Sequence, residues 1–535
     1  MLLVVLSLSI TLVTAANEHW KIIDTWDDGQ GFYSELNIPV VKTTSDGWTV
    51  TISFSGPVTD LQAWTAETAP VKGSENTVYK LRNRAWNSQI FQGQNLKIDM
   101  SGMSDIRPEG ASGPIVDFQG VSYDTSIEVS DDYDYYADDQ GFNYGAPPTV
   151  DFPMDLSDIL HKSLMFFEGQ WSGHISKATN YRILWKGDSA LTDGNDIGLD
   201  LTGGFYVGGD HIKFNYAIAH FMTVLAWSVK HYKNAYFDAA DPNGTPGLHF
   251  AYRTLRWGAD YLMKCHPDAN TIVAQIGDPN EDHKEWMRAE SIDTFMTGRP
   301  TFLLTKGVDK GQDIASEMAA ALAATAIATY HVNTTYAQVL LNQAESLYDF
   351  ALASPGEYDE NPHMESVKNH FKSLSDDDEI AWAETWLYTA TSDETYLNSA
   401  ISRLSTDDWL KKDVPEEFSY DDKRIGMHIL LSEYGDIYQD SDVSKQVVEK
   451  YCKRHLPGGD VPNTAEGMIY LDNWNNLGLA SSVGFICLMA SEQNEDEETS
   501  ANFYNMAKNI AQFAVGSSGD SYVSVLEIIE DKSEA

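Results

Sequence analysis

The sequence predicts a multidomain protein, an all-β sandwich followed by an all-α domain, and three observations indicate this order. From about residue 18 to 120, apolar and polar residues alternate with a period of two, as in half-buried strands. From about residue 156 the period becomes 3.6, as in amphipathic helices. A segment rich in Asp, Tyr and Gly separates the two patterns. A chain of 535 residues is also too long for one ordinary core.

The chain begins with a short apolar stretch, residues 1–16, which ends in the small residues Thr14, Ala15 and Ala16. Its length and its small-residue end predict a signal peptide, because the stretch is too short to cross a bilayer. We therefore expect an extracellular protein without a membrane partner. The formal net charge of -44 also argues against nucleic acid as a partner, because the phosphate backbone would be repelled.

Residues 17–120 form the predicted β-sandwich. Its expected strands carry these alternating apolar residues: Leu36, Ile38 and Val40; Trp48, Val50, Ile52 and Phe54; Leu96, Ile98 and Met100. Residues 121–150 are the predicted linker, since they are acidic and rich in Tyr and Gly and close with Pro147 and Pro148.

Residues 151–535 form the predicted helical domain. About eleven helical stretches are expected, among them 213–233, 247–264, 313–331, 334–353, 379–392, 422–435, 478–491 and 501–514. Long loops rich in Gly, Asp and aromatic residues join them, and such loops commonly carry binding and catalytic residues. The three cysteines, Cys265, Cys452 and Cys487, leave at least one unpaired within a monomer, so core packing is expected to hold the domain together.

Three motifs in the β-sandwich resemble a family 2 carbohydrate-binding module: GWTV at 47–50, LQAW at 61–64 and NRAWN at 83–87. The resemblance implies a strip of exposed aromatic side chains that stacks on the apolar faces of glucose rings. Trp26, Trp64 and Trp86 match that strip. The alternative is that these tryptophans pack in the core, as the phase of Trp48 with its strand predicts for Trp48.

The helical domain carries a longer series of motifs in order: NYRILWKGDSA at 180–190, DLTGGFY at 200–206, KCHP at 264–267, QIGD at 275–278, EMAAALA at 317–323 and DDKR at 421–424. Together they resemble family 9 glycoside hydrolases, the endo-β-1,4-glucanases or cellulases. The resemblance implies an (α/α)6 barrel that hydrolyses cellulose or a related β-1,4-glucan with inversion, and no cofactor is required for that catalysis.

Asp210 matches the catalytic base of this family, which takes a proton from the attacking water. The family motif is Asp-Ala-Gly-Asp, and this chain has VGGD at 207–210. The assisting carboxylate is thus replaced by Val207, which can neither accept a proton nor bind water. The alternative for Asp210 is the N-cap of a following helix.

The family's general acid, a Glu in the last helix after a Pro-His-His-Arg segment, has no match here. The chain reads LEIIEDK at 526–532 in its place. The resemblance thus predicts C-terminal truncation, with the barrel's last helix missing. Two functions stay open: an endoglucanase of impaired activity, or a non-catalytic glucan-binding protein on a degenerate hydrolase scaffold.

Further contacts are implied by the resemblance. His266 and Trp474 match sugar-binding positions, although a histidine at the end of a helix is an equally good interpretation of His266. A structural calcium site of the family matches Asp378 and Glu379, within LSDDDE at 374–379. The alternative for these carboxylates is an acidic surface loop.

Overall fold

A computed structural model describes much of the chain. The described residues are 10–12, 20–26, 31–39, 49–54, 56–63, 66–83, 95–103, 118–124, 156–178, 181–239, 241, 245–284, 287–295, 298–365, 370–406, 410, 414–434, 441–464, 467–473 and 475–515. Contacts divide the chain into two compact units, residues 1–143 with 329–335, and the remainder.

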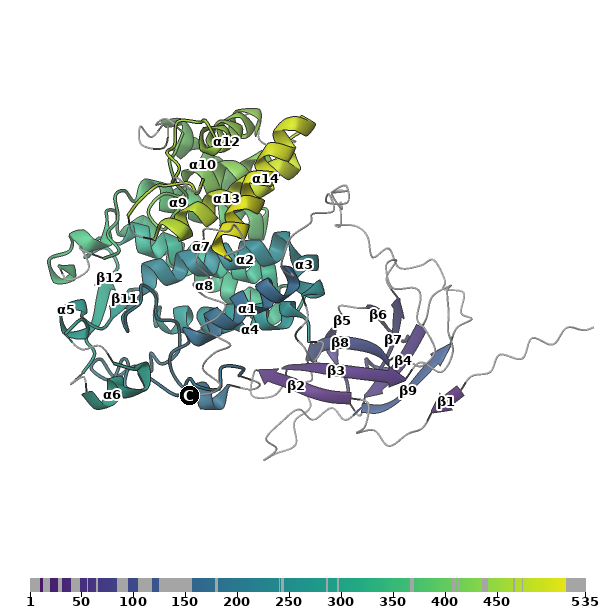
Figure 1. Ribbon diagram of the computed structural model, residues 1–535. Coiled ribbons are helices and arrows are strands. Elements are labelled where there is room, and N and C mark those ends of the chain that lie inside the picture. The colour runs from purple at the N-terminus through teal and green to yellow at the C-terminus, as the bar shows by residue number, and fades with distance from the viewer. Residues whose placement is uncertain are drawn as a thin grey trace, which may run out of the picture. The chain divides into compact units, whose positions relative to one another are not determined.

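Within its described residues, the first unit has nine strands in two antiparallel sheets (Figure 1). One sheet has the order β1-β9-β4-β7-β6 and the other β2-β3-β8-β5. The strands are β1 (Ile10–Leu12), β2 (Trp20–Trp26), β3 (Gly31–Pro39), β4 (Thr49–Phe54), β5 (Thr59–Ala63), β6 (Ala66–Pro70), β7 (Val78–Asn83), β8 (Asn95–Met103) and β9 (Phe118–Asp124).

Side chains from both sheets share one buried core. Its members include Leu36, Val50, Ile52, Phe54, Leu96, Ile98 and Met100. These are residues at which the period-two pattern predicts buried side chains, because alternate side chains of a strand point to the same face. Strand β9 runs to Asp124, four residues beyond the predicted end of the sandwich. Strand β1 lies within residues 1–16 and pairs with β9, so removal of the predicted signal peptide would leave β9 at the edge of its sheet.

The second unit is mainly helical. Its helices are α1 (Leu156–Gly169), α2 (Asn215–His231), α3 (Lys233–Asp238), α4 (Gly247–Lys264), α5 (Pro279–Asp282), α6 (Ile292–Phe295), α7 (Gln312–Thr329), α8 (Thr334–Ala353), α9 (Asp377–Thr391), α10 (Glu394–Thr406), α11 (Arg424–Ser432), α12 (Ser441–His455), α13 (Asn476–Gln493) and α14 (Glu497–Ala514). The eight helices expected at stated positions are all present, with ends shifted by a few residues.

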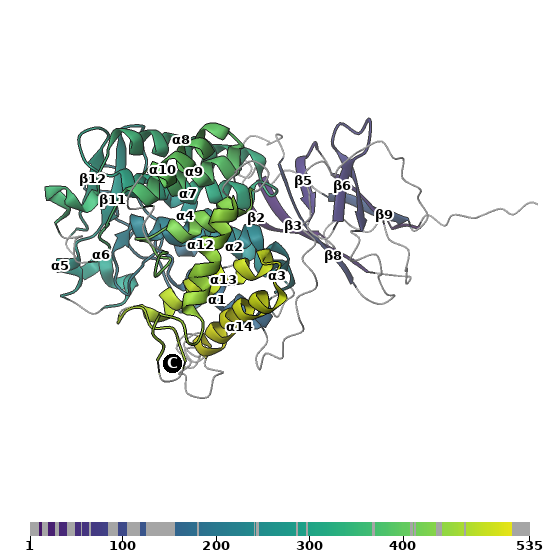
Figure 2. The ribbon, with the colours of Figure 1, turned by 90° about the horizontal axis from the view of Figure 1, so that it is seen from above.

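Burial separates central from peripheral helices. Every residue of α7 except Ile327 is buried, and α9 is buried from Asp378 to Tyr388. By contrast, α14 buries one stripe, Phe503, Met506 and Ile510, and packs along α13 (Figure 2). Helices that are buried all round lie at the centre of a domain, so this unit is barrel-like, with outer helices covering inner ones. None of the described helices has the length and apolar character that a membrane crossing needs.

A small antiparallel sheet lies at one end of the helical unit, beside α5 (Figure 1). Its order is β10 (Lys213–Phe214), β11 (Thr271–Ile276) and β12 (Thr301–Thr305). Strand β10 leads directly into α2. The loop before β10 is therefore fixed at this end of the unit by pairing with a segment about sixty residues later.

A disulfide joins Cys452 on α12 to Cys487 on α13, and Cys265 is free and buried. The bond closes a loop with a sequence separation of 35 residues. Cys452→Ser is expected to lower the free energy of unfolding by about 2–4 kcal/mol, because the unfolded chain gains the freedom of that loop. Urea unfolding followed by circular dichroism measures the loss. An unchanged midpoint would contradict the prediction, and Cys487→Ser should match Cys452→Ser.

Candidate active site

Asp210 lies in the loop before β10, where two glycines turn the chain. Gly208 and Gly209 have φ angles of 99° and 83°, a left-handed region that side chains other than glycine rarely adopt. Asp210 Oδ1 accepts a hydrogen bond from the backbone N–H of Ile212 at 3.0 Å. Helix α2 begins at Asn215 with Phe214 as its N-cap. The N-cap interpretation of Asp210 is therefore wrong, because the two-residue strand β10 separates Asp210 from the helix.

The second carboxylate oxygen of Asp210 contacts a histidine that directly follows α5. His283 Nε2 lies 2.9 Å from Asp210 Oδ2. The neighbouring residue Asp282 accepts hydrogen bonds from the backbone N–H of His211 at 3.2 Å and pairs with His211 Nδ1 at 3.1 Å. Burial alone would raise the pKa of Asp282, but these bonds from His211 hold it below its ordinary value. The two Asp–His contacts join residues about seventy positions apart.

Val207, the first residue of the VGGD segment, packs against an apolar cluster. The buried members of this cluster are Ile212, Phe214 and Ala217, and Phe371 packs against it as Val207 does. A valine in these surroundings offers no atom that could orient a water molecule. The position thus contributes to packing between the loop and α2.

A buried ionic triad includes a residue of the strand that follows the Asp210 loop. Asp193 pairs with Lys213 of β10 and with Arg299, each at 2.7 Å, and all three side chains are at most 1% exposed. Burial alone would raise the pKa of Asp193, but Lys213 and Arg299 hold it below its ordinary value. The triad ties three distant segments together, so it fixes the strand that follows Asp210.

Aromatic rings lead from the Asp210 loop toward the centre of the helical unit. Phe214 contacts Phe371 at a centroid distance of 4.8 Å, and Phe371 contacts Tyr420 at 5.0 Å. Tyr420 in turn lies 5.8 Å from Tyr216 on α2. Phe371 and Tyr420 are only partly buried. Partly exposed aromatic rings beside a carboxylate are suited to stacking on sugar rings.

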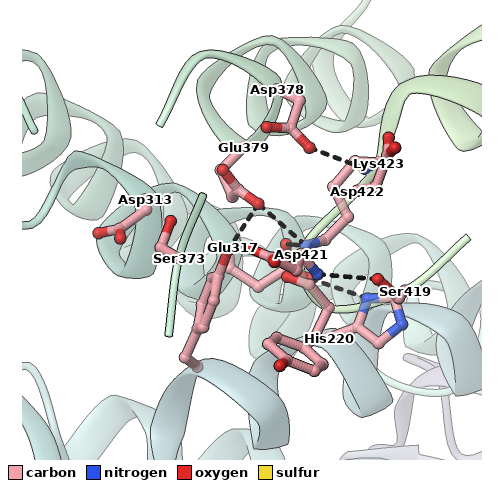
Figure 3. Close-up of polar contacts among 12 residues, drawn as sticks. His220, Asp313, Glu317, Ser373, Asp378, Glu379, Ser419, Asp421, Asp422 and Lys423 are labelled. Atoms are coloured by element: carbon pink, nitrogen blue, oxygen red, sulfur yellow. Dashed lines mark hydrogen bonds and ion pairs between the residues drawn. The ribbon is translucent and has the colours of Figure 1, made fainter. Parts of the chain in front are cut away.

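Lys423 is the centre of a buried charged cluster (Figure 3). Its ammonium lies 3.3 Å from Glu317 on α7 and 3.1 Å from Glu379 on α9, and all three side chains are 0% exposed. Tyr216 donates a hydrogen bond to Glu379 at 2.6 Å. Burial alone would lower the pKa of Lys423, but Glu317 and Glu379 raise it above its ordinary value. The ammonium thus links α7, α9 and the segment before α11.

Asp378 and Glu379, the predicted calcium ligands, lie in the first turn of α9. Asp378 Oδ2 accepts the backbone N–H of Lys423 at 2.8 Å. Asp378 Oδ1 and Glu379 Oε2 are buried and accept no hydrogen bond from the described residues. Burial raises the pKa of Asp378 to about 6. These two buried carboxylate oxygens have no donor among the described residues, and Ca²⁺ prefers oxygen ligands, but the ammonium of Lys423 already lies 3.1 Å from Glu379.

His266 lies at the end of α4 and is 3% exposed. Its Nδ1 is 3.1 Å from the carbonyl of Thr271 and its Nε2 is 2.8 Å from the hydroxyl of Ser346. Both ring nitrogens thus contact protein atoms, and the predicted sugar contact of His266 stays a prediction.

The predicted tryptophan contacts fall largely outside the described residues. Trp26 is the last residue of β2, and its side chain is not among the described groups. Trp64, Trp86 and Trp474 lie outside the described residues. The contacts expected of these four residues therefore stay predictions.

Sequence reasoning assigned no role to several residues of this site. Asp282 and His283 are neighbours in the sequence, but no pattern of nearby residues indicates that they contact His211 and Asp210. Nor does any pattern of nearby residues indicate that Lys213 forms a triad with Asp193 and Arg299. A charged residue within a short apolar strand was the one available signal, since such a residue needs a buried partner.

The model of glycosyl hydrolase family 9 matches residues 157–527. Endoglucanase 14 of Arabidopsis thaliana is 35% identical over 360 residues, which cover 66% of this chain and 70% of that protein. The endoglucanase of the termite Nasutitermes takasagoensis, solved at pH 2.5, matches with a TM-score of 0.62 and 31% identity, over 69% of this chain and 80% of that one.

Endoglucanase CelQ from Clostridium thermocellum, complexed with cellobiose and cellotriose, matches with a TM-score of 0.58 and 28% identity, over 68% of this chain and 57% of that one. The helical fold, and the match of the family model to more than half of the chain, establish that the chain belongs to glycosyl hydrolase family 9.

Proposed function

We propose that this protein is a β-1,4-glucan hydrolase of low activity in which Asp210 is the catalytic base. The observation that carries the proposal is the placement of Asp210. Its carboxylate is held by Ile212 and His283, and partly exposed aromatic rings lie nearby. The related CelQ was solved with cellobiose and cellotriose, which supports a glucan as the substrate class.

In the proposed reaction a water molecule attacks the anomeric carbon of a glucose unit. Asp210 takes one proton of that water, the bond from the anomeric carbon to the leaving oxygen breaks, and this oxygen takes a proton from a carboxylic acid on the opposite face of the sugar. Because the water attacks the face opposite the leaving oxygen, the reaction inverts the anomeric configuration. We assign the acid role to none of the described residues.

The activity is proposed to be low because Val207 replaces the assisting carboxylate. A water that is not oriented loses much of the advantage of a fixed reaction geometry. This same observation favours the second candidate, a non-catalytic glucan-binding protein. Reducing-end release from carboxymethyl-cellulose, with a parallel cellulose pull-down, distinguishes the two. Slow release supports the hydrolase, and retention without release supports the binding protein. If neither release nor retention occurs, the protein has no glucan site.

The N-terminal unit is proposed to be a carbohydrate-binding module with family 2 character. The two sheets with one core support it, as do the motifs around Trp64 and Trp86. Trp64→Ala with Trp86→Ala is expected to weaken retention on crystalline cellulose at least tenfold, because two stacking surfaces are lost. Trp26→Ala should weaken it further, and hydrolysis of soluble carboxymethyl-cellulose should stay unchanged. Full retention by the variants would contradict the module's assignment.

A structural Ca²⁺ ion is proposed at Asp378 and Glu379, supported by their unpartnered buried oxygens. Removing calcium with EGTA is expected to lower the free energy of unfolding by about 2–3 kcal/mol, as for an ion present at a hundred times its Kd. Thermal unfolding with and without added calcium measures the effect. Asp378→Asn with Glu379→Gln should abolish the response, and Glu394→Gln in the exposed first turn of α10 should keep it.

Secretion is proposed from the apolar stretch at residues 1–16, and the disulfide between Cys452 and Cys487 supports an oxidising compartment. Mass spectrometry of the secreted protein should find Asn17 at its N-terminus. An intact Met1 on secreted protein would contradict the cleavage site.

A further inference from the structure

Asp210, Asp282 and His283 form a compact group of metal-ligand types. One ligand atom of each lies within 4.8 Å of the other two. The closest pair, His283 Nε2 and Asp210 Oδ2, is 2.9 Å apart. Two ligands of a tetrahedral zinc ion lie roughly 3.4 Å apart, since each bond is about 2.1 Å long. Small side-chain rotations would therefore bring all three atoms to one ion.

Other groups hold the two carboxylates in place. The N–H of Ile212 binds Asp210 Oδ1, and His211 binds both oxygens of Asp282 through its backbone N–H and its ring. Outer contacts of this kind orient ligands in metal sites. The side chains of Asp210 and Asp282 are 10% and 4% exposed, whereas that of His283 is 47% exposed. The two carboxylates are thus largely buried, and an ion can enter the group from the solvent on the side of the exposed histidine.

An independent observation comes from His370. Its ring centroid lies 5.2 Å from that of His283. Its Nδ1 is buried and has no hydrogen-bond partner among the described residues. A buried ring nitrogen without a partner is uncommon, because burial removes its water without replacement. A bound ion at the adjacent group would supply a partner for a nitrogen in this position after a rotation of the ring.

Charge also favours a cation. Asp210 and Asp282 contribute two negative charges, and the charged groups that act on Asp282 are His211 and Arg299. Arg299 is already paired with Asp193, as is Lys213. The donors are mixed, with oxygen from carboxylates and nitrogen from imidazole. This set suits Zn²⁺, Co²⁺, Ni²⁺ and Cu²⁺, whereas Ca²⁺ and Mg²⁺ prefer oxygen alone.

The geometry points to a divalent transition-metal site formed by Asp210, Asp282 and His283. The site is distinct from the proposed calcium site at Asp378 and Glu379. A metal ion there engages the carboxylate of Asp210, so the ion inhibits hydrolysis. This last consequence rests on the proposed function, whereas metal binding does not.

Isothermal titration of the EDTA-treated, dialysed full chain with ZnCl₂, in excess calcium, tests the proposal. We expect one site that is weakened at least tenfold by His283→Ala and by Asp210→Asn. His174→Ala, which removes a half-exposed histidine paired with Asp188, serves as the matched control and should bind Zn²⁺ as the parent does. Circular dichroism of each variant verifies its fold. Binding that is absent from the parent, or unchanged in both variants, would overturn the proposal.

Activity on carboxymethyl-cellulose is measured separately. Loss of activity on addition of Zn²⁺, in proportion to the occupancy found by titration, supports both the metal site and the base role of Asp210. Specific Zn²⁺ binding by a chain that never hydrolyses glucan supports the metal site and contradicts the proposed hydrolase. If the parent still hydrolyses glucan when the metal site is fully occupied, and Asp210→Asn abolishes that site, the proposed inhibition by the ion is wrong.

Discussion

Replacing Lys423 by methionine is expected to lower the free energy of unfolding of the helical unit by about 3–5 kcal/mol. The ammonium of Lys423 lies between Glu317 and Glu379, and none of the three side chains is exposed. Methionine has a similar length but no charge. The substitution therefore leaves Glu317 buried without its cation, and removal of one partner of a buried pair costs more than the pair itself contributes.

Urea unfolding followed by far-ultraviolet circular dichroism measures this loss. Lys453→Met is the matched control, because Lys453 pairs with Glu449 on the surface of α12. An exposed pair of this type contributes about 0.3–0.5 kcal/mol. Adding Glu317→Gln and Glu379→Gln to Lys423→Met should recover part of the stability. If Lys423→Met and Lys453→Met unfold at the same urea concentration, Lys423 does not stabilise the domain as described.

Asp210→Asn is expected to reduce the rate of reducing-end release about 10²–10⁴-fold, the usual contribution of a general base. Asparagine has nearly the same shape and keeps an oxygen that can accept the N–H of Ile212. It cannot take a proton from water. The free energy of unfolding and the retention on crystalline cellulose should therefore stay close to those of the parent.

Initial rates on carboxymethyl-cellulose, with EDTA-treated and dialysed protein and calcium added back, check this prediction. Asp200→Asn is the matched control, because Asp200 is a partly exposed carboxylate that binds Thr202 and Lys264. It should retain the parent rate within a factor of two or so. Equal rates for Asp210→Asn and the parent would remove Asp210 from the chemistry. A parent with no measurable rate would instead favour the non-catalytic candidate.

The Asp210 site illustrates how far sequence reasoning reaches. The match of VGGD at 207–210 to a family motif singled out Asp210 and showed that Val207 lacks a carboxylate. It did not show that Val207 packs against the same apolar cluster as Phe371, which is more than 160 residues later in the chain. Nor did it pair Asp210 with His283, because no local pattern records which loops meet across a small sheet.

The sequence by itself determined the order of the two domains, the positions of the eight named helices and the alternating core residues of the first unit. These follow from local periodicity, since a period of 3.6 or 2 places apolar side chains on one face whatever the rest of the chain does. Only the tertiary structure decided the β10-β11-β12 sheet, the disulfide between Cys452 and Cys487, and the burial of Lys423 between two acids. Each depends on packing between distant segments. The residues next to a segment in the sequence do not determine the free energy of such contacts.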